Sequence, residues 1–472
     1  MLTEKEIARR LADAESSHGL FAFEYNGIAL WRLVRSRTGF AMQGHGLQPR
    51  ALDDRLALLV RGLRSCLDYG LALLKGRRRY VVKTYSSALR TLREGRYEDI
   101  YFDALMTQVA GGSKWSYCNS VAFASREKQA RVRIEFDTSF VQIASALLAR
   151  VWSFSRDPHP FGALANAVEQ ALGPGILSAS QARFLYAKFR WQVCFYSLLL
   201  RRQRPAVVCV VNTGEYALMH AAQRSGIRFI ELQHGIFSAD HPDALPEAAL
   251  DQARGDLLLP DVLAVYGEYW RNYLSGTAIA RLERIVPCGC AVLEEYRGVR
   301  RAISDGPPSA QPLQILLTTQ GLSVGELVGC VSAFLDACAR PLTLNMKLHP
   351  IYDDEAAYQV LAQDSRVRIL GATDATPTHL LMARADMHVS ISSACHYDAL
   401  AVGVPTVVLR LPGHELMLPL IESGDAVLVR SASELSEYVG QLVENPSSAE
   451  HAEYFCRTGF VQNLREVAGL VE

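Results

Sequence analysis

The chain has 472 residues, of which 49% are hydrophobic and 21% are charged. This length fits two domains of about 100–200 residues each or somewhat more, and the composition excludes disordered, collagen-like and coiled-coil proteins. The 49 Lys and Arg residues balance 49 Asp and Glu residues. The chain therefore has no net positive charge to attract nucleic acid, and a nucleic-acid binder is disfavoured.

The cysteines and the N-terminal segment indicate a cytoplasmic protein. The ten cysteines form no Cys-x-x-Cys pair and no Cys/His cluster with metal-ligand spacing, which is typical of free thiols in a reducing compartment. The segment Met1–Glu6 lacks the basic and apolar regions of an export signal. The best apolar run, around Val141–Leu148, is shorter than the ~18 residues that a membrane span needs.

Residues 1–78 are predicted to form a helical N-terminal extension, because apolar residues recur there at helical spacing. Within Leu56–Leu74, Arg61 and Arg64 stand among leucines, and residues 75–79 are basic. A basic amphipathic segment of this kind can rest on an anionic membrane surface, which would place the protein peripherally at the inner membrane. The alternative is the solvated edge of an ordinary packed helix, and the sequence leaves both interpretations open.

Residues 79–305 are predicted to form a first Rossmann-like domain, which would bind the acceptor. Its clearest unit is a strand, a helix over Glu215–Ser225 and a second strand, which together form a βαβ crossover. The expected strands are Tyr80–Lys83, Asp99–Phe102, Val132–Glu135, Ala206–Val211, Arg228–Leu232, Val262–Tyr266 and Ile285–Pro287.

Residues 306–472 are predicted to form a second Rossmann-like domain, because Asp305–Ser309 interrupts the pattern with turn-forming residues. The expected strands are Leu313–Thr319, Leu342–Leu348, Val367–Leu370, Asp386–Ile391 and Thr406–Arg410, and the expected helices are Val324–Cys338, Thr376–Ala383, His396–Val402 and Ser447–Leu470. Alternation of strand and helix in both halves predicts an α/β fold with two doubly wound domains that face a central cleft.

In an open parallel sheet, ligands bind at the carboxyl ends of the strands. In the second domain, Ser392 and Ser393 stand between a predicted strand and a helix. Their hydroxyls and the helix N-terminus suit an anion, although serine is also a common helix cap. His349-Pro350 ends another predicted strand, where the imidazole can donate to a phosphate or a leaving-group oxygen, although a single histidine at a strand end is usually structural.

In the first domain, Glu215 follows one strand of the βαβ unit and His234 follows the other. Parallel pairing would place them at neighbouring strand ends, with Glu215 as general base and His234 as its support or as a group that orients the acceptor. Gln233 and Gly235 flank His234 and are candidate acceptor-binding residues. The alternative role of Glu215 is a first-turn charge that stabilises the helix dipole.

The chain resembles the GT-B glycosyltransferase-like proteins of bacterial capsule and lipopolysaccharide gene clusters. The resemblance covers about residues 20–430, and the order of the short motifs is more specific than any one of them. The motifs are Phe21-Ala-Phe-Glu-Tyr-Asn-Gly-Ile28, Glu231-Leu-Gln-His-Gly235, Leu259-Pro-Asp261, Tyr266-Gly-Glu-Tyr-Trp270, Lys347-Leu-His-Pro350, Ser390-Ile-Ser-Ser393 and Ala401-Val-Gly-Val-Pro405.

The resemblance implies roles for several residues. In members that use CMP-sugars, such as sialyltransferases and Kdo transferases, a His-Pro motif and a Ser-Ser motif hold the cytidine nucleotide. The matching nucleotide-binding residues here are Lys347, His349, Pro350, Ser392 and Ser393, and Asp398 stands where those families have a ribose-binding Glu. In those families the general base is an acidic residue followed by glycine. Here the order is reversed, in Gly214-Glu215, so Asp240 and Asp243 are alternative candidates for the base beside Glu215.

The resemblance implies a glycosyltransferase that needs no metal or other cofactor. The donor would be a nucleotide-sugar, with a 2-keto acid sugar such as Kdo and its CMP donor as the best expectation, and the acceptor a surface polysaccharide or a lipid-linked saccharide. Three alternatives remain: transfer of a polyol phosphate from a CDP-activated donor, 2-epimerisation of a sugar nucleotide, and a non-catalytic scaffold for polysaccharide assembly.

Overall fold

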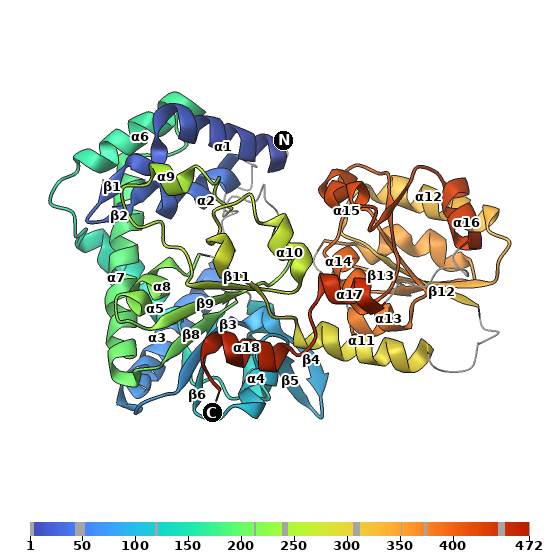
Figure 1. Ribbon diagram of the computed structural model, residues 1–472, viewed down its shortest axis with the longest axis horizontal. Coiled ribbons are helices and arrows are strands. Elements are labelled where there is room, and N and C mark those ends of the chain that lie inside the picture. The colour runs from blue at the N-terminus through green and yellow to red at the C-terminus, as the bar shows by residue number, and fades with distance from the viewer. Residues whose placement is uncertain are drawn as a thin grey trace. The chain divides into compact units, whose positions relative to one another are not determined.

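The computed structural model describes residues 4–42, 52–118, 121–211, 214–237, 244–304, 312–350, 352–371, 374, 376–441 and 449–471. The chain divides into two compact units (Figure 1). The first unit comprises Met1–Val265, Trp270–Pro287 and Val461–Glu472, and the second comprises Tyr266–Tyr269 and Cys288–Phe460.

The first unit contains a parallel seven-stranded sheet in the order β11-β10-β9-β8-β3-β6-β7. The strands are β3 (Tyr80–Tyr85), β6 (Gly112–Tyr117), β7 (Phe136–Asp137), β8 (Val207–Val210), β9 (Arg228–Leu232), β10 (Val262–Val265) and β11 (Ile285–Pro287). Chain order reverses between β3 and β8, because β6 and β7 extend the sheet on one side of β3 and the later strands on the other. This is a doubly wound sheet.

The helices of the first unit cover this sheet and build a helical N-terminal region (Figure 1). They are α1 (Glu4–His18), α2 (Leu30–Met42), α3 (Leu52–Leu74), α4 (Asp103–Gln108), α5 (Ser139–Val151), α6 (His159–Leu172), α7 (Ala179–Gln203), α8 (Tyr216–Gln223) and α9 (Ala249–Gln252). Shorter elements are the hairpins β1 (Glu24–Tyr25) with β2 (Ile28–Ala29) and β4 (Leu89–Arg93) with β5 (Arg96–Asp99), and the 3₁₀ helices η1 (Leu20–Ala22), η2 (Ser86–Ala88), η3 (Val121–Gln129) and η4 (Leu282–Arg284).

The second unit contains a parallel six-stranded sheet in the order β14-β13-β12-β15-β16-β17. The strands are β12 (Leu313–Thr318), β13 (Leu342–Lys347), β14 (Val367–Leu370), β15 (Met387–Ser390), β16 (Thr406–Leu409) and β17 (Val427–Val429). In chain order this is 3-2-1-4-5-6, the Rossmann order, with the reversal between β12 and β15.

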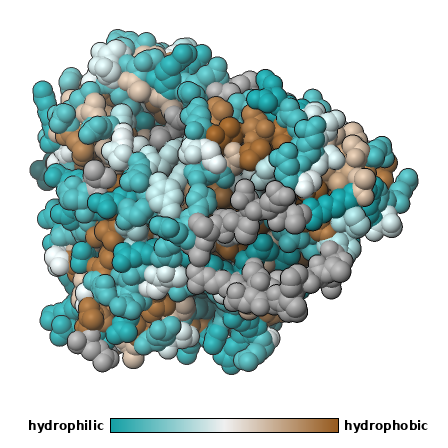
Figure 2. Space-filling view, turned by 45° about the vertical axis from the view of Figure 1, so that its right-hand side comes forward, coloured by the Kyte–Doolittle hydropathy of each residue, from teal (hydrophilic) through white to brown (hydrophobic). Residues whose placement is uncertain are grey.

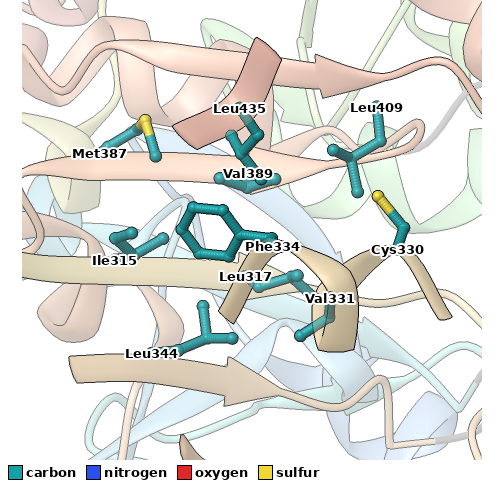
Figure 3. Close-up of a pocket in the computed structure, with 10 residues that line it drawn as sticks. All are labelled: Ile315, Leu317, Cys330, Val331, Phe334, Leu344, Met387, Val389, Leu409 and Leu435. Atoms are coloured by element: carbon teal, nitrogen blue, oxygen red, sulfur yellow. The ribbon is translucent and has the colours of Figure 1, made fainter. Parts of the chain in front are cut away.

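The remaining helices of the chain lie around this second sheet, except for most of the two helices Glu268–Tyr273 and Phe460–Ala468, which belongs to the first unit. They are α10 (Glu268–Tyr273), α11 (Ala291–Ser304), α12 (Val324–Ala337), α13 (Thr378–Arg384), α14 (Cys395–Val402), α15 (Leu418–Glu422), α16 (Ala432–Gln441), α17 (Ala449–Phe455) and α18 (Phe460–Ala468), with η5 (Glu355–Gln363) and η6 (His414–Met417). Phe334 of α12 packs onto the sheet against Ile315 and Val389 (Figure 3). The cavity that these side chains line has a volume of about 10 Å³, which is room for about one water molecule. The core is therefore densely packed.

The prediction of two doubly wound α/β domains with a helical N-terminal region is confirmed by these strand orders. The βαβ unit of β8, α8 and β9 forms as predicted, with Val207 paired to Arg228 and Val210 to Glu231. Fully buried strands of this kind are continuous apolar runs, which makes them the easiest to find in a sequence.

Two predicted strands of the first domain are wrong. In the segment Asp99–Phe102 only Asp99 is in a strand, and the following residues turn into α4 because the Asp99 carboxylate accepts the N–H of Tyr101 at 2.9 Å. The segment Val132–Glu135 is irregular, and the strand begins only at Phe136.

The division of the chain differs from the predicted boundary at 305/306. The main segment of the second unit already begins with Cys288, and the last twelve residues, 461–472, belong to the first unit. The described part of the predicted helix Ser447–Leu470 is also two helices, α17 and α18, with a break at residues 456–459. Gly459 has a φ of +82° there, and the Glu294 carboxylate accepts its N–H at 2.9 Å, which turns the chain before α18 begins.

Candidate functional site

Each sheet has one position where the chain order reverses, and ligands of doubly wound folds bind outside the carboxyl ends of the strands at this position. In the second unit the reversal lies between β12 and β15. In the first unit it lies between β3 and β8.

In the second unit, the loop after β15 touches the loop after β12. Ser392 Oγ donates to Gln320 Oε1 at 3.3 Å, and Ser393 Oγ accepts the N–H of Cys395, the first residue of α14, at 3.2 Å. Both serines are buried. One hydroxyl thus joins the two loops at the reversal, and the other fixes the start of α14, so the pair is held where a helix N-terminus meets the sheet edge.

His349 directly follows Leu348 beyond the end of β13, as predicted, and its ring is fixed by the loop. The ring stacks on Tyr352 with centroids 4.4 Å apart, and Nδ1 accepts the Tyr352 N–H at 3.3 Å. In the neutral ring the proton is therefore assigned to Nε2, which is then a hydrogen-bond donor. Pro350 is exposed in the turn that follows.

Asp353 links the loop after β12 to the loop after β13. Its carboxylate accepts the hydroxyl of Thr319 at 2.7 Å, the N–H of Gly321 at 2.8 Å and the N–H of His349 at 2.7 Å. It also accepts the hydroxyl of Tyr358, whose pKa is raised by burial and by this carboxylate. The next residue, Asp354, caps η5 with its side chain. The linking role of Asp353 was missed.

The other predicted nucleotide-binding residues have protein partners. Lys347 Nζ donates to the backbone oxygen of Asp374 at 3.0 Å and lies 3.2 Å from its carboxylate. Hydrogen bonds from Thr376, and to a lesser extent Lys347, lower the pKa of Asp374 against the opposing effect of burial. Asp398 lies on α14 and contacts His379 Nε2 at 3.1 Å. Lys347 therefore orients the loop after β14, and His379 orients Asp398.

A buried histidine pair lies beneath the Ser392–Ser393 loop. His388 Nδ1 and His396 Nδ1 both contact Thr406 Oγ1, at 2.8 Å and 2.6 Å. Burial lowers the pKa of His388 well below its usual value and that of His396 to about 3, so both rings are neutral at pH 7. This network connects β15, α14 and β16 directly under the loop.

At the reversal in the first unit, Glu215 forms an ion pair with Lys83 of β3. Lys83 is 2% exposed, and its ammonium lies 5.8 Å from the ring centre of Tyr196 and 6.0 Å from that of Tyr117. Burial, and then the charge of Glu215, raises the pKa of Tyr196 well above its usual value. Glu215 directly precedes α8 and makes no side-chain hydrogen bond that caps this helix.

His234 lies beside two aromatic rings, Tyr85 at 6.5 Å and Phe237 at 5.4 Å between ring centres. The hydroxyl of Tyr101 donates to the backbone oxygen of His234 at 3.0 Å. Tyr101 is in turn held by the Asp99 carboxylate, which forms a buried ion pair with Lys114 at 3.2 Å. The loop after β9 is therefore fixed from the side of the β5–α4 turn.

The predicted acceptor-binding residues flank His234. Gln233 is buried, and its Nε2 donates to the Gly235 oxygen at 2.8 Å, so its side chain stabilises its own loop. Among the described residues other than its two chain neighbours, no heavy atom lies within 4 Å of the position that a Cβ of Gly235 would take. Asp240 and Asp243 lie outside the described residues.

Solved structures with a similar arrangement exist, whereas no protein-family model and no curated protein matches the chain. UDP-GlcNAc 2-epimerase from Neisseria meningitidis is 13% identical, with a TM-score of 0.48 over 83% of this chain and 100% of that chain. MurG from Acinetobacter baumannii is 14% identical, with a TM-score of 0.47 over 83% and 100%. The wall teichoic acid polymerase TagF is 10% identical, with a TM-score of 0.46 over 89% and 97%. Similarity at this level transfers no function.

Two further observations complete the site. Within the described residues, no group of three or more His, Cys, Asp or Glu side chains is arranged to hold a metal ion. Lys83 was not predicted as a site residue. A lysine inside the strand-like run Tyr80–Tyr85 is nevertheless a signal, since lysine is almost never fully buried without a partner.

Proposed function

We propose that the protein is an enzyme that uses a nucleotide-activated sugar and holds the phosphates of its donor at the carboxyl edge of the second sheet. The observation that carries the proposal is the convergence of three loops. Asp353 ties the loop after β12 to His349 after β13, and Ser392 ties the same loop to the start of α14. All three loops meet beside the reversal in strand order, where doubly wound sheets bind their ligands.

The chemistry of these loops suits a leaving phosphate. Nε2–H of His349 supplies one donor, and the Ser392–Ser393 loop supplies hydroxyls and the positive end of the α14 dipole. Donors of this kind stabilise the charge that develops on a leaving diphosphate or monophosphate in the transition state. Asp353 keeps His349 in place by accepting its backbone N–H.

For the reaction we propose sugar transfer with Glu215 as the general base of the first unit. The buried Lys83 keeps this carboxylate oriented beside the strand end, and a fixed carboxylate can accept the proton of an acceptor hydroxyl. The His-Pro and Ser-Ser elements further suggest a CMP-activated 2-keto acid sugar such as Kdo as the donor, and a surface polysaccharide or a lipid-linked saccharide as the acceptor.

A thermal-shift series tests the nucleotide. Protein is heated with CMP, CDP, UDP, GDP or dTDP, since a ligand that binds only the native state raises the melting temperature. CMP should give the largest shift, and His349→Ala should reduce it while Tyr352→Phe, which keeps the stacked ring, should not. The absence of a shift with every nucleotide would refute the proposal.

Product analysis then tests the reaction. Free nucleotide should appear only when a saccharide acceptor is present. An altered sugar nucleotide without acceptor would identify an epimerase, a transferred polyol phosphate would identify a phosphotransferase, and no turnover despite nucleotide binding would identify a scaffold.

A further inference from the structure

Within Val60–Leu74, the helix α3 exposes large apolar residues and buries Tyr69 together with small residues. Hydrophobic residues are interspersed among hydrophilic ones on the face shown in Figure 2, as is normal for protein surfaces. On α3 they instead form one continuous line, here called the apolar stripe of α3, which consists of Val60, Leu63, Leu67, Leu71 and Leu74. Leu67 is 74% exposed and Leu74 is 75% exposed. Their spacing of three and four residues places them on one helix face.

The packing of the opposite face fixes this orientation. The inward residues are Gly62, Ser65, Tyr69 and Ala72. A Cβ at Gly62 would lie 2.2 Å from Ile143 Cδ1, so a larger residue here would have to displace the end of the Ile143 side chain on α5. Tyr69 donates from its hydroxyl to the Phe195 oxygen at 3.0 Å and packs among three phenylalanine rings. Rotation of α3 to bury its leucines would break these contacts.

The helices that pack against α3 also expose apolar side chains. On α5, Leu147 is exposed, and at its end Val151 and Trp152 are 86% and 62% exposed. On α7, Leu198 is exposed. An exposed tryptophan suits the boundary between lipid and water, because its ring is apolar and its N–H is polar.

Basic residues adjoin the stripe at its C-terminal end. The end of α3 meets the end of α7, where the Arg78 N–H donates to the Gln203 oxygen at 2.7 Å and Arg202 Nε donates to the Leu73 oxygen at 2.9 Å. Arg77, Arg201, Arg202 and Arg204 are exposed around this junction. Within Val60–Leu74, Arg64 is exposed, and the one carboxylate, Asp68, is half-buried.

We propose that the apolar stripe of α3 docks on the surface of an anionic lipid bilayer, with the arginine cluster at the end of α3 and α7 against the lipid headgroups. Leucines inserted among acyl chains and guanidinium groups beside anionic headgroups are the two attractions that hold an amphipathic helix in the interface. The arginines favour this occupant over a second copy of the chain, since two copies joined through this face would bring like charges together.

Vesicle flotation tests the proposal with the full chain. Vesicles of phosphatidylglycerol and phosphatidylethanolamine should carry the protein to the top of a density gradient, and vesicles of phosphatidylcholine alone should carry at least ten-fold less. Leu67→Glu/Leu71→Glu should abolish flotation, and Arg77→Glu/Arg201→Glu should reduce it and remove most of its salt dependence. Leu92→Glu, at an exposed leucine of the β4–β5 hairpin, is the matched control and should float like the wild type.

Two results would overturn the proposal. One is equal flotation of the wild type and the Leu67→Glu/Leu71→Glu variant. The other is a wild-type chain that ignores anionic vesicles but is dimeric in sedimentation and becomes monomeric in that variant, because the stripe is then a protein interface. Vesicle binding needs no substrate, so the result is independent of the proposed enzymatic function.

Discussion

Lys83 and Glu215 form an ion pair at the reversal of the first sheet, although they are 132 positions apart in the chain. Lys83 lies in the middle of β3, and Glu215 immediately precedes α8. The pair therefore joins β3 to the loop after β8, the two neighbouring strands between which the strand order reverses. It orients the carboxylate at the place where the fold provides a site.

Lys83→Met should destabilise the first unit strongly. Removing one partner of a buried ion pair leaves the other charge unpaired, which costs about 3–5 kcal/mol. All five tryptophans lie in the first unit, so their fluorescence during urea unfolding reports on that unit alone. The double variant Lys83→Met/Glu215→Gln should recover part of the loss, and a single-variant effect below about 1 kcal/mol would show that the pair contributes little.

Glu215→Gln should lower the rate of sugar transfer at least about 10²-fold, the usual contribution of a general base. The rate is measured per folded molecule, with folding checked by tryptophan fluorescence, because the substitution also leaves Lys83 without its charged partner. The nucleotide-induced thermal shift should persist. Glu247→Gln, at an exposed carboxylate of the same unit, is the control. Near-normal transfer by the Gln variant would direct the search to Asp240 and Asp243.

His349→Ala should lower kcat about 10²–10³-fold, as when one donor to a developing oxyanion is removed. The reason is that Nε2–H of the fixed ring is the donor that the leaving phosphate would meet. Tyr352→Phe retains the stacked ring and should keep near-normal turnover. Steady-state kinetics of the two variants decide the point, and unchanged kcat in His349→Ala would leave His349 a structural residue at a strand end.

The parts of the fold that a local sequence pattern determines could be predicted from the sequence. Apolar runs such as Val207–Val210 identify buried strands, and the polar residues that follow them lie at the carboxyl edge of a parallel sheet. This is why Ser392 and His349 were found. The strand β6 was missed because its buried positions on both faces include Ser113, Lys114 and Ser116 in place of aliphatic residues.

The remaining parts depend on contacts between distant segments. Nothing local to Lys83 indicates that its partner is Glu215, and nothing local to Asp353 indicates that it accepts an N–H from the loop after β12. The leucines of α3 were visible as an amphipathic pattern, but which face is buried depends on how closely Gly62 lets the helix approach α5.

The buried histidines should make the second unit less stable in acid. His396 has a folded-state pKa of about 3 against 6.5 ordinarily, and the pKa of His388 is also far lowered. Between about pH 6.5 and 3, the unfolded chain binds protons that the folded chain does not bind, so the free energy of unfolding falls as pH falls. Each histidine contributes about 1.4 kcal/mol per pH unit at full slope.

Hydrogen exchange, measured by mass spectrometry on peptides from β15 and α14 at several pH values, gives the slope of the free energy of unfolding against pH. His396→Asn retains a polar group beside Thr406 but cannot take up a proton, so it should remove about half of the histidine-dependent slope. His414→Asn, outside the buried network, should keep it. A wild-type slope of zero between pH 7 and 5 would contradict the prediction.

Asp353→Asn should weaken nucleotide binding and loosen the loops of the second unit, although Asp353 need not touch the ligand. The carboxylate accepts hydrogen bonds from Thr319, Gly321 and His349, and from the protonated hydroxyl of Tyr358. An amide offers one oxygen, and its NH₂ group would face at least one of these donors. A donor left without an acceptor costs about 1–3 kcal/mol, so we expect a loss of stability in this range and about a ten-fold loss of nucleotide affinity.

Calorimetric titration with the nucleotide that gives the largest thermal shift measures the affinity. Asp354→Asn is the matched control, since asparagine caps a helix as well as aspartate does. If both variants bind nucleotide equally well, the loops converge without Asp353 and the proposed organisation of the site is wrong.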